Sequence, residues 1–372
     1  MCGSGVLPFS LQHVMKRWNL FSGAWLSLIW IVGMALLALT GYAWLPDSTP
    51  DANRMQVSLA LLPPGSSVDF LKTHSNETSQ SRAFFKGSPD THQEIPFFSS
   101  KTVKKDSFFQ IVLFQDLTDT PLLQKELPFS VVKPQNISTL THRRNFWLGT
   151  DRYGRDVLSR LILGARISLG IGLVAVFISL VLGLFVGLTS GYFGGWVDKI
   201  LSWITQVVWS LPTILVVIAI TLALGKGFWQ VFLAVGLTMW VEVARMVRGQ
   251  VMSIRNEEFV LAAKAIGASD VRIILRHVLP QLLGPLLVIC TANFSSAILL
   301  ESGLSFLGLG VQPPAPSWGQ MIREHYGYII LDKPWSAIVP GAAIMMSVVA
   351  FNQIGQVLRD RMDIRTLNST NT

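Results

Sequence analysis

The chain of 372 residues is 50% hydrophobic and only 14% charged, and its mean hydropathy is +0.46. Soluble globular chains carry roughly 25% charged residues, so this composition excludes an ordinary soluble domain and indicates a polytopic membrane protein. The net charge of +8 is explained by basic residues that flank membrane spans, because no basic stripe interleaved with aromatic residues is present for nucleic-acid binding.

The N-terminal segment, residues 1–45, is predicted to be a cytoplasmic N-terminus followed by a first transmembrane helix. An apolar stretch from about Ala24 to Leu45 is long enough to cross a bilayer. Lys16 and Arg17 precede it, which places the N-terminus inside. Its length, and the lack of a small-residue cleavage site at its far end, favour a retained span over a signal peptide.

Residues 46–146 are polar and contain no stretch long enough to cross. We therefore expect a small insertion on the outer (periplasmic) face. Two segments resemble β-strands, Ser107 to Leu117 and Leu127 to Val132. The first half, Asp51 to Ser100, is rich in Ser, Thr, Gly and Pro and is expected to be only partly ordered.

The third part, residues 147–365, is predicted to contain five more spans. These run from about Ile167 to Tyr192, Ile200 to Leu224, Phe228 to Val247, Leu279 to Leu300, and Trp335 to Leu358. Arginines follow the last span, so six crossings with both termini in the cytoplasm are self-consistent, and residues 366–372 form a cytoplasmic tail. Gly183, Gly187 and Gly191 are spaced four apart, which predicts a small-residue face for close helix packing. Pro212 predicts a kink within its span.

A short amphipathic helix is expected before the second span, with Thr150 or Asp151 as its cap. Four arginines surround it, at positions 152, 155, 160 and 166. On this topology they lie outside, against the positive-inside rule; the long preceding insertion weakens that rule here.

The loop after the fifth span reads ESGLSFLGLGVQPPAPSWG. Its apolar residues Leu304 and Phe306 indicate a segment that packs over the mouth of the bundle. Glu301 at its head either faces a polar pathway or is an ordinary residue of the outer interface. The second interpretation is favoured, because a charge near a span end costs little.

The segment from about Ala244 to Pro280 is a basic connection between two spans, which the positive-inside rule assigns to the cytoplasm. Its apolar residues are spaced as in two helices, Gly267 interrupts them, and Pro280 is expected to end the run. Ser269 with Asp270 would cap the second helix. On periodicity alone, an amphipathic helix lying at the membrane surface explains it equally well.

A sequence resemblance adds to this interpretation. Ala262-Ala263, Gly267 and Leu279-Pro280 resemble the coupling-loop signature of ABC importer permeases, although Leu261 stands where that family most often has Glu. The segments LGTDRYGRDVLSRLILGARISL, GYFGGWVDKIL, WSLPTILVVIAI and AIVPGAAIMMSVVAFNQIGQVLRDRMD resemble the C-type permease subunit of bacterial dipeptide/oligopeptide and nickel ABC importers. The likeness covers most of residues 147–365 and fails over residues 46–146.

The resemblance implies an all-α fold, that of a type I ABC importer permease in the inner membrane, with a coupling helix at about residues 256–277. It implies a heterodimer with a homologous second permease, two cytoplasmic ABC ATPase subunits that bind the ATP, and a periplasmic peptide-binding protein. The residues expected to couple this chain to the ATPase are Ala262, Ala263, Lys264, Gly267, Arg272, Leu279 and Pro280. Small side chains at the alanines allow close approach of another surface, and the glycine supplies a bend.

The sequence predicts no catalytic residue, cofactor or metal site on this chain. Gly225-Lys226-Gly227 lacks the hydroxyl residue and upstream glycine of a phosphate-binding loop. His74, His92 and His142 lack ligand spacing.

Two alternatives of other classes were weighed. A membrane-embedded enzyme would need paired ionisable groups inside the spans, and the candidates, Glu242 and Arg245, are more simply a local ion pair. An ion-driven secondary transporter would show buried acidic residues and internal repeats. The cargo, whether dipeptide, oligopeptide or a nickel chelate, cannot be read from the residues.

Overall fold

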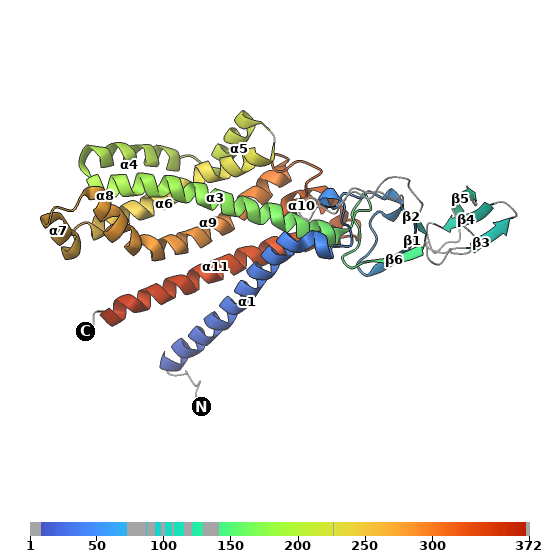
Figure 1. Cartoon of the computed structure of the whole chain (residues 1–372), viewed down its shortest axis with the longest axis horizontal. Coiled ribbons are helices and arrows are strands. Elements are labelled where there is room, and N and C mark those ends of the chain that lie inside the picture. The colour runs from blue at the N-terminus through green and yellow to red at the C-terminus, as the bar shows by residue number, and fades with distance from the viewer. Residues whose placement is uncertain are drawn as a thin grey trace, which may run out of the picture.

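The computed structural model describes residues 9–72, 87, 94–97, 101–105, 108–114, 121–128, 141–225 and 227–369. It is a bundle of long helices with the strands gathered beyond one end (Figure 1). The long helices are α1 (Phe9–Trp44), α3 (Val157–Phe193), α4 (Gly195–Trp209), α5 (Thr213–Leu224), α6 (Phe228–Ile254), α9 (Leu279–Leu307) and α11 (Trp335–Ser369). The short ones are α7 (Glu258–Ala265), α8 (Asp270–Ile273), α10 (Trp318–His325), the 3₁₀ turns η1 (Pro50–Ala52), η2 (Val57–Leu59) and η4 (Tyr326–Ile329), and the π-turn η3 (Ile274–Val278).

Within the described residues, five helical segments are long and apolar enough to cross a membrane. They are Ala24–Trp44, Val157–Phe193, Trp229–Ile254, Asp270–Leu307 and Trp335–Met362. A sixth crossing arises if α4 and α5 count together, since they are joined at a bend of 89°. The predicted class, an all-α polytopic membrane protein, is confirmed. Pro212 stands at this bend as the cap of α5, so the predicted kink is a complete break.

The helix expected before the second span is continuous with it, because α3 runs unbroken from Val157. Its cap is Asp156, whose carboxylate accepts from the backbone N–H of Ser159 at 2.9 Å. The prediction of Thr150 or Asp151 as the cap is therefore wrong. Both side chains have other partners: the Thr150 hydroxyl accepts from the N–H of Leu62, and Asp151 binds Arg155.

Helices α3 and α6 pack along the predicted glycine face. A Cβ atom built on Gly183, Gly187 or Gly191 would lie no more than 2.8 Å from the Cβ atom of Val243, Val247 or Val251, respectively. Such a separation is too short for any side chain, so the two backbones touch through these glycines. The predicted small-residue face is confirmed.

Glu301 is fully buried between α3 and α9, with 0% of its surface exposed. The hydroxyls of Ser168 and Ser305 donate to its two carboxylate oxygens at 3.2 and 2.7 Å. The favoured interpretation, an ordinary interface residue, is wrong, because the loop after α9 folds back and covers it. That loop places Val311 in the same apolar core as Ile171 of α3, as expected for a segment over the bundle mouth.

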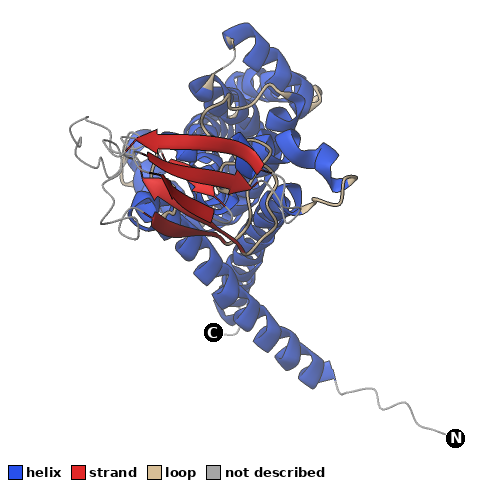
Figure 2. Ribbon diagram, turned by 90° about the vertical axis from the view of Figure 1, so that its right-hand side faces the viewer, coloured by secondary structure: helices blue, strands red, loops and turns tan. Residues whose placement is uncertain are grey.

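The strands form two antiparallel three-stranded sheets with the orders β2-β1-β6 and β3-β4-β5 (Figure 2). The strands are β1 (Ser66–Lys72), β2 (Glu94–Phe97), β3 (Lys101–Lys105), β4 (Phe108–Phe114), β5 (Pro121–Pro128) and β6 (Thr141–Phe146).

The strand predicted at Ser107 to Leu117 contains β4. The second predicted strand was placed too late, because β5 precedes most of it; residues 129–132 lie outside the described residues. Pairing with β4, from Phe108 opposite Pro128 to Phe114 opposite Pro121, sets the position of β5.

The start of α1 and the end of α11 lie on the same side of the molecule (Figure 1). The first turns of α1, the last turns of α11 and the α7–α8 segment all lie toward one end of the long axis, and the strands lie at the other (Figure 1). This arrangement has the sidedness that the predicted topology requires.

The α3–α6 contact predicts a specific sensitivity to added volume. Gly187→Ala would force a Cβ to 2.7 Å from both the Val247 Cβ and the Ala244 carbonyl oxygen. We expect a loss of roughly 1–3 kcal/mol, as for other overpacked sites, measured as a lower Tm of the purified protein in mild detergent.

Gly249→Ala is the matched control, because Gly249 lies on α6, the other helix of this contact, and a Cβ there would meet nothing within 4 Å. Equal melting temperatures for the two variants would show that the close contact is not formed.

Candidate functional site

Helices α7 and α8 form a ledge at the end of the bundle away from the strands (Figure 1). Gly267 joins them with φ of +83°, a left-handed conformation that favours glycine. Ser269 occupies the cap position of α8 without a side-chain hydrogen bond, contrary to its predicted capping role. The prediction that Pro280 ends the helical segment after Gly267 is wrong. Pro280 stands in the first turn of α9, and the π-turn η3 precedes it, which accommodates a residue without an N–H.

The ledge is held on the bundle by a buried apolar face. Val260, Ala263, Ile273 and Val278 pack in one core with residues of α3, α6 and α9. The Tyr192 hydroxyl of α3 donates to the Asp270 carboxylate at 2.7 Å, and Arg255 donates to the Gly191 carbonyl at 3.1 Å. The ledge is thus attached to three long helices at once.

The opposite face of the ledge is apolar and exposed. Ile266 is 85% exposed, and Phe259, Leu261, Val271 and Leu275 are also exposed. The same segment also exposes the charged residues Glu257, Glu258, Lys264 and Arg272. A contiguous apolar patch with a polar rim is typical of a protein interface.

The structure brings all seven predicted coupling residues onto this ledge or its junction with α9. Ala262, Lys264, Gly267, Arg272 and Pro280 are exposed. Ala263 is 6% exposed and belongs to the core beneath, and Leu279 packs against that core. Docking through the exposed members stays a prediction, and the two inward residues would act by supporting them.

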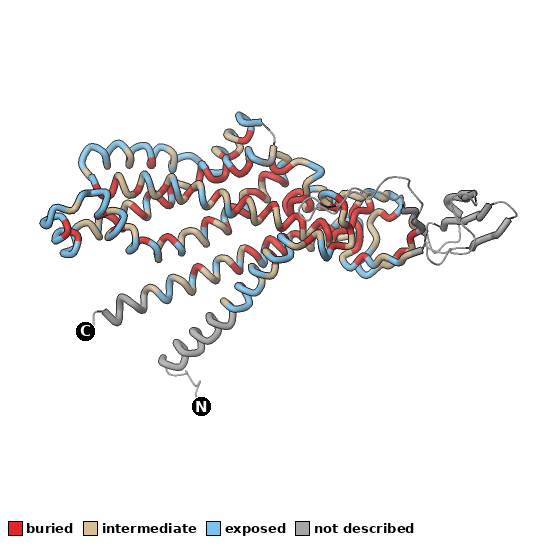
Figure 3. Tube along the Cα trace, viewed as in Figure 1, coloured by how far each residue is buried: buried red, intermediate tan, exposed pale blue. Residues whose placement is uncertain are grey.

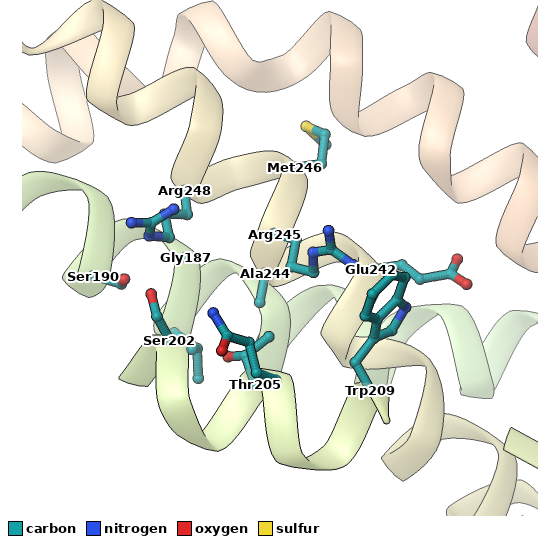
Figure 4. Close-up of a pocket in the computed structure, with 12 residues that line it drawn as sticks. Gly187, Ser190, Ser202, Thr205, Trp209, Glu242, Ala244, Arg245, Met246 and Arg248 are labelled. Carbon is teal, nitrogen blue, oxygen red and sulfur yellow. The ribbon is translucent and has the colours of Figure 1, made fainter. Parts of the chain in front are cut away.

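A polar pocket of about 760 Å³ lies between α3, α4 and α6 (Figure 4). The guanidinium of Arg248 binds the Asp198 carboxylate through two hydrogen bonds of 2.6 and 2.7 Å, and the Ser202 hydroxyl also donates to this carboxylate. Nearby, the guanidinium of Arg245 stacks 3.8 Å from the centre of the Trp209 ring.

The predicted ion pair of Glu242 and Arg245 is not formed. Figure 4 shows the Glu242 carboxylate directed away from Arg245, which stacks on Trp209 instead. The sequence analysis missed the Asp198–Arg248 pair, since fifty residues separate its members. The available signal was an acidic residue among apolar ones on one span and two arginines near the end of another.

Near the strands, a cluster of charged residues is buried where α3 and α10 meet, in the most continuously buried part of the molecule (Figure 3). The Arg155 guanidinium donates to Asp151 at 2.5 Å and to Glu324 at 2.7 Å. Arg160 lies 3.9 Å from the same Asp151. These pairs explain why arginines accumulate before the second span: two of the four neutralise buried carboxylates rather than orient the chain.

Asp151, Glu324 and His325 have the donor types of a metal site, and their ligand atoms lie within 4.8 Å of one another. Arg155 already binds both carboxylates, and with Arg160 it balances their charge, so we expect no cation to bind. Burial lowers the pKa of His325, and its Nδ1 lies 2.7 Å from the Met321 carbonyl oxygen, which favours a neutral ring with the proton on Nδ1. His74 and His92 lie outside the described residues.

These features define a class: a multi-pass α-helical membrane protein that exposes apolar side chains on a short helical ledge at one end of its bundle. The family described as "Binding-protein-dependent transport system inner membrane component" matches residues 161–366. The chain belongs to this family and is a permease subunit. Membership implies an ATPase and a substrate-binding protein as partners.

Individual relatives agree. The chain is 40% identical to the dipeptide transport system permease protein DppC of Bacillus subtilis over 258 residues, 69% of this chain and 79% of that protein. It is 42% identical to the protein of the same description from Alkalihalophilus pseudofirmus, over 58% of this chain and 71% of that protein. A solved structure of the inward-facing MetNI methionine ABC transporter matches with a TM-score of 0.43 and 21% identity, over 54% of this chain and 97% of that one.

The buried charge cluster predicts a large effect of removing its central cation. Arg155→Met would leave Asp151 and Glu324 buried without their main partner, and we expect a loss of roughly 3–5 kcal/mol. The measurement is thermal unfolding of the purified protein in detergent.

Arg152→Met is the control, because the guanidinium groups of Arg152 and Arg155 both lie 4.5 Å from the centre of the Tyr153 ring, but Arg152 forms no ion pair with any described residue. If Arg155→Met melts no lower than Arg152→Met, the cluster does not stabilise the fold.

Proposed function

We propose that this permease subunit forms half of the pathway of an ATP-driven importer for dipeptides or oligopeptides. The observation that carries the proposal is the exposed apolar face of the ledge, which is rigidly attached to the helices that cross the membrane. The cargo is proposed from the relatives, which are described as dipeptide transport permeases.

We propose that a homologous second permease completes the pathway, that two ATPase subunits dock below it, and that an outer peptide-binding protein delivers cargo. ATP would then be bound by the partners, and this chain would carry no cofactor and no catalytic residue. Both termini and the ledge would be cytoplasmic, with the strand-bearing residues 46–146 outside. The shared end of these elements and the basic residues Arg255, Lys264, Arg272 and Arg276 support that orientation.

Force would reach the membrane through the core beneath the ledge. Ala263 and Ile273 pack with Val247 and Val251 of α6 and Leu282 of α9. Close-packed side chains have low compressibility and therefore transmit displacement. A shift of the docked ledge would move α6 and α9 together. An ion-driven carrier would have no use for such a surface.

The proposal predicts that one exposed side chain controls docking. Ile266→Asp adds a charge to the centre of the apolar face without touching the core, because Ile266 is 85% exposed. We expect recovery of the ATPase with this chain to fall roughly tenfold or more, as for a hot-spot residue, and ATP-dependent peptide uptake to fall with it. Co-purification from mild detergent and uptake into proteoliposomes measure the two effects.

Ile330→Asp is the matched control: Ile330 is 87% exposed, lies beside α10 rather than on the ledge, and should leave co-purification unchanged. Retention of the ATPase by Ile266→Asp, at the level of this control, would contradict docking on the ledge.

A further inference from the structure

The polar pocket beside α6 carries two charges without an ion pair among the residues that the structure describes. Within the described residues, neither the Arg245 guanidinium nor the Glu242 carboxylate has a hydrogen bond or ion pair. The neighbouring charges are different, because Arg248 and Asp198 neutralise each other on the pocket wall. One cation and one anion are therefore available to a ligand.

The two charges lie within a segment long and apolar enough to cross the membrane, Trp229–Ile254. Charged side chains at such positions are costly, and they usually line a polar path. Glu242 and Arg245 are three residues apart on α6, so they lie on the same face of that helix. They diverge rather than meet (Figure 4), which leaves a ligand room to reach both.

A second, more apolar pocket of about 380 Å³ adjoins the first. Trp209 and Glu242 line both pockets, so the two are contiguous at these side chains. The second pocket continues past Leu211 at the α4–α5 bend to Leu299 and Leu300 of α9. A polar chamber with both charges thus opens beside an apolar chamber.

Resting on the function proposed above, we propose that this pocket is a binding site on this chain for short unblocked peptides. Arg245 binds the terminal carboxylate, which its planar guanidinium accepts through paired hydrogen bonds. Glu242 binds the terminal ammonium group. The apolar chamber takes a side chain of the peptide, and Trp209, which lines both chambers, lies beside it. A ligand with both termini blocked loses both ionic contacts.

The site is tested by the protection of a cysteine in the pocket. Gln206 is exposed and lines the polar chamber. Gln206→Cys is made in a background where Cys2 and Cys290 are replaced by serine, and the whole transport complex is placed in phosphatidylcholine nanodiscs, which lack competing anionic lipid. The labelling rate with a maleimide is measured without ATP or binding protein, against increasing trialanine or N-acetyl-trialanine amide.

We expect trialanine to slow labelling and the blocked peptide to have little effect. Adding Arg245→Gln should raise the trialanine concentration for half-protection about tenfold or more, as expected on losing a hydrogen bond between charged groups, and Arg245→Lys should restore part of it. Lys199→Gln is the matched control, because Lys199 lies 5.1 Å from the Trp196 ring on α4 and does not line the pocket.

Three results would overturn the site: no protection by trialanine, equal protection by the blocked peptide, or an unchanged half-protection concentration in Arg245→Gln. ATP-driven uptake by the same complex, reconstituted in proteoliposomes, separates this failure from that of the proposed function. Normal uptake without protection removes the site alone, whereas no ATP-driven uptake removes the importer proposal and the cargo role of the pocket with it.

Discussion

The contact on which the rest of the structure depends is the close approach of α3 and α6. Three glycines of α3 receive three valines of α6 at a distance that excludes any side chain on α3. With little hydrophobic driving force between helices inside a bilayer, this fit of backbone to side chain supplies much of the stabilisation. It also fixes the rotation of α6, so that the Val243 face is buried and the face carrying Glu242 and Arg245 looks into the pocket.

The charged residues are buried and paired at one end of the bundle and exposed at the other. Near the strands, Arg155, Asp151 and Glu324 are buried and paired, which locks the entry to α3 against α10. At the ledge, Lys264 and Arg272 are exposed beside an apolar surface. A buried pair favours one fixed arrangement, whereas exposed charge around an apolar patch suits association with another protein. The strand end is therefore built to hold its geometry and the ledge end to meet a partner.

Local pattern predicted the spans, the glycine face, a kink at Pro212 and the position of the ledge, because each depends on residues close in sequence. Contacts between distant segments were not predictable. Asp198 and Arg248 come from different spans, and Glu301 is buried because a later loop covers it. Asp156 rather than Asp151 caps α3, since Arg155 and the chain around it engage Asp151. The predicted coupling residues lie on the ledge or at its junction with α9, and their docking role stays a prediction; only the fold shows that Ala263 faces inward.

Helix α6 joins the two parts of the proposed mechanism. Its Val247 and Val251 belong to the core beneath the ledge, and its Glu242 and Arg245, which precede Val247, line the polar pocket. A helix segment of this length behaves as a rigid rod, so displacement of the ledge by a closing ATPase must displace one wall of the pocket relative to α4, which carries Trp209. The stack of Arg245 on Trp209 connects α6 to α4 across the pocket. On the proposed function, the same movement that the ATPase drives therefore changes the affinity of the site for the charged ends of its cargo.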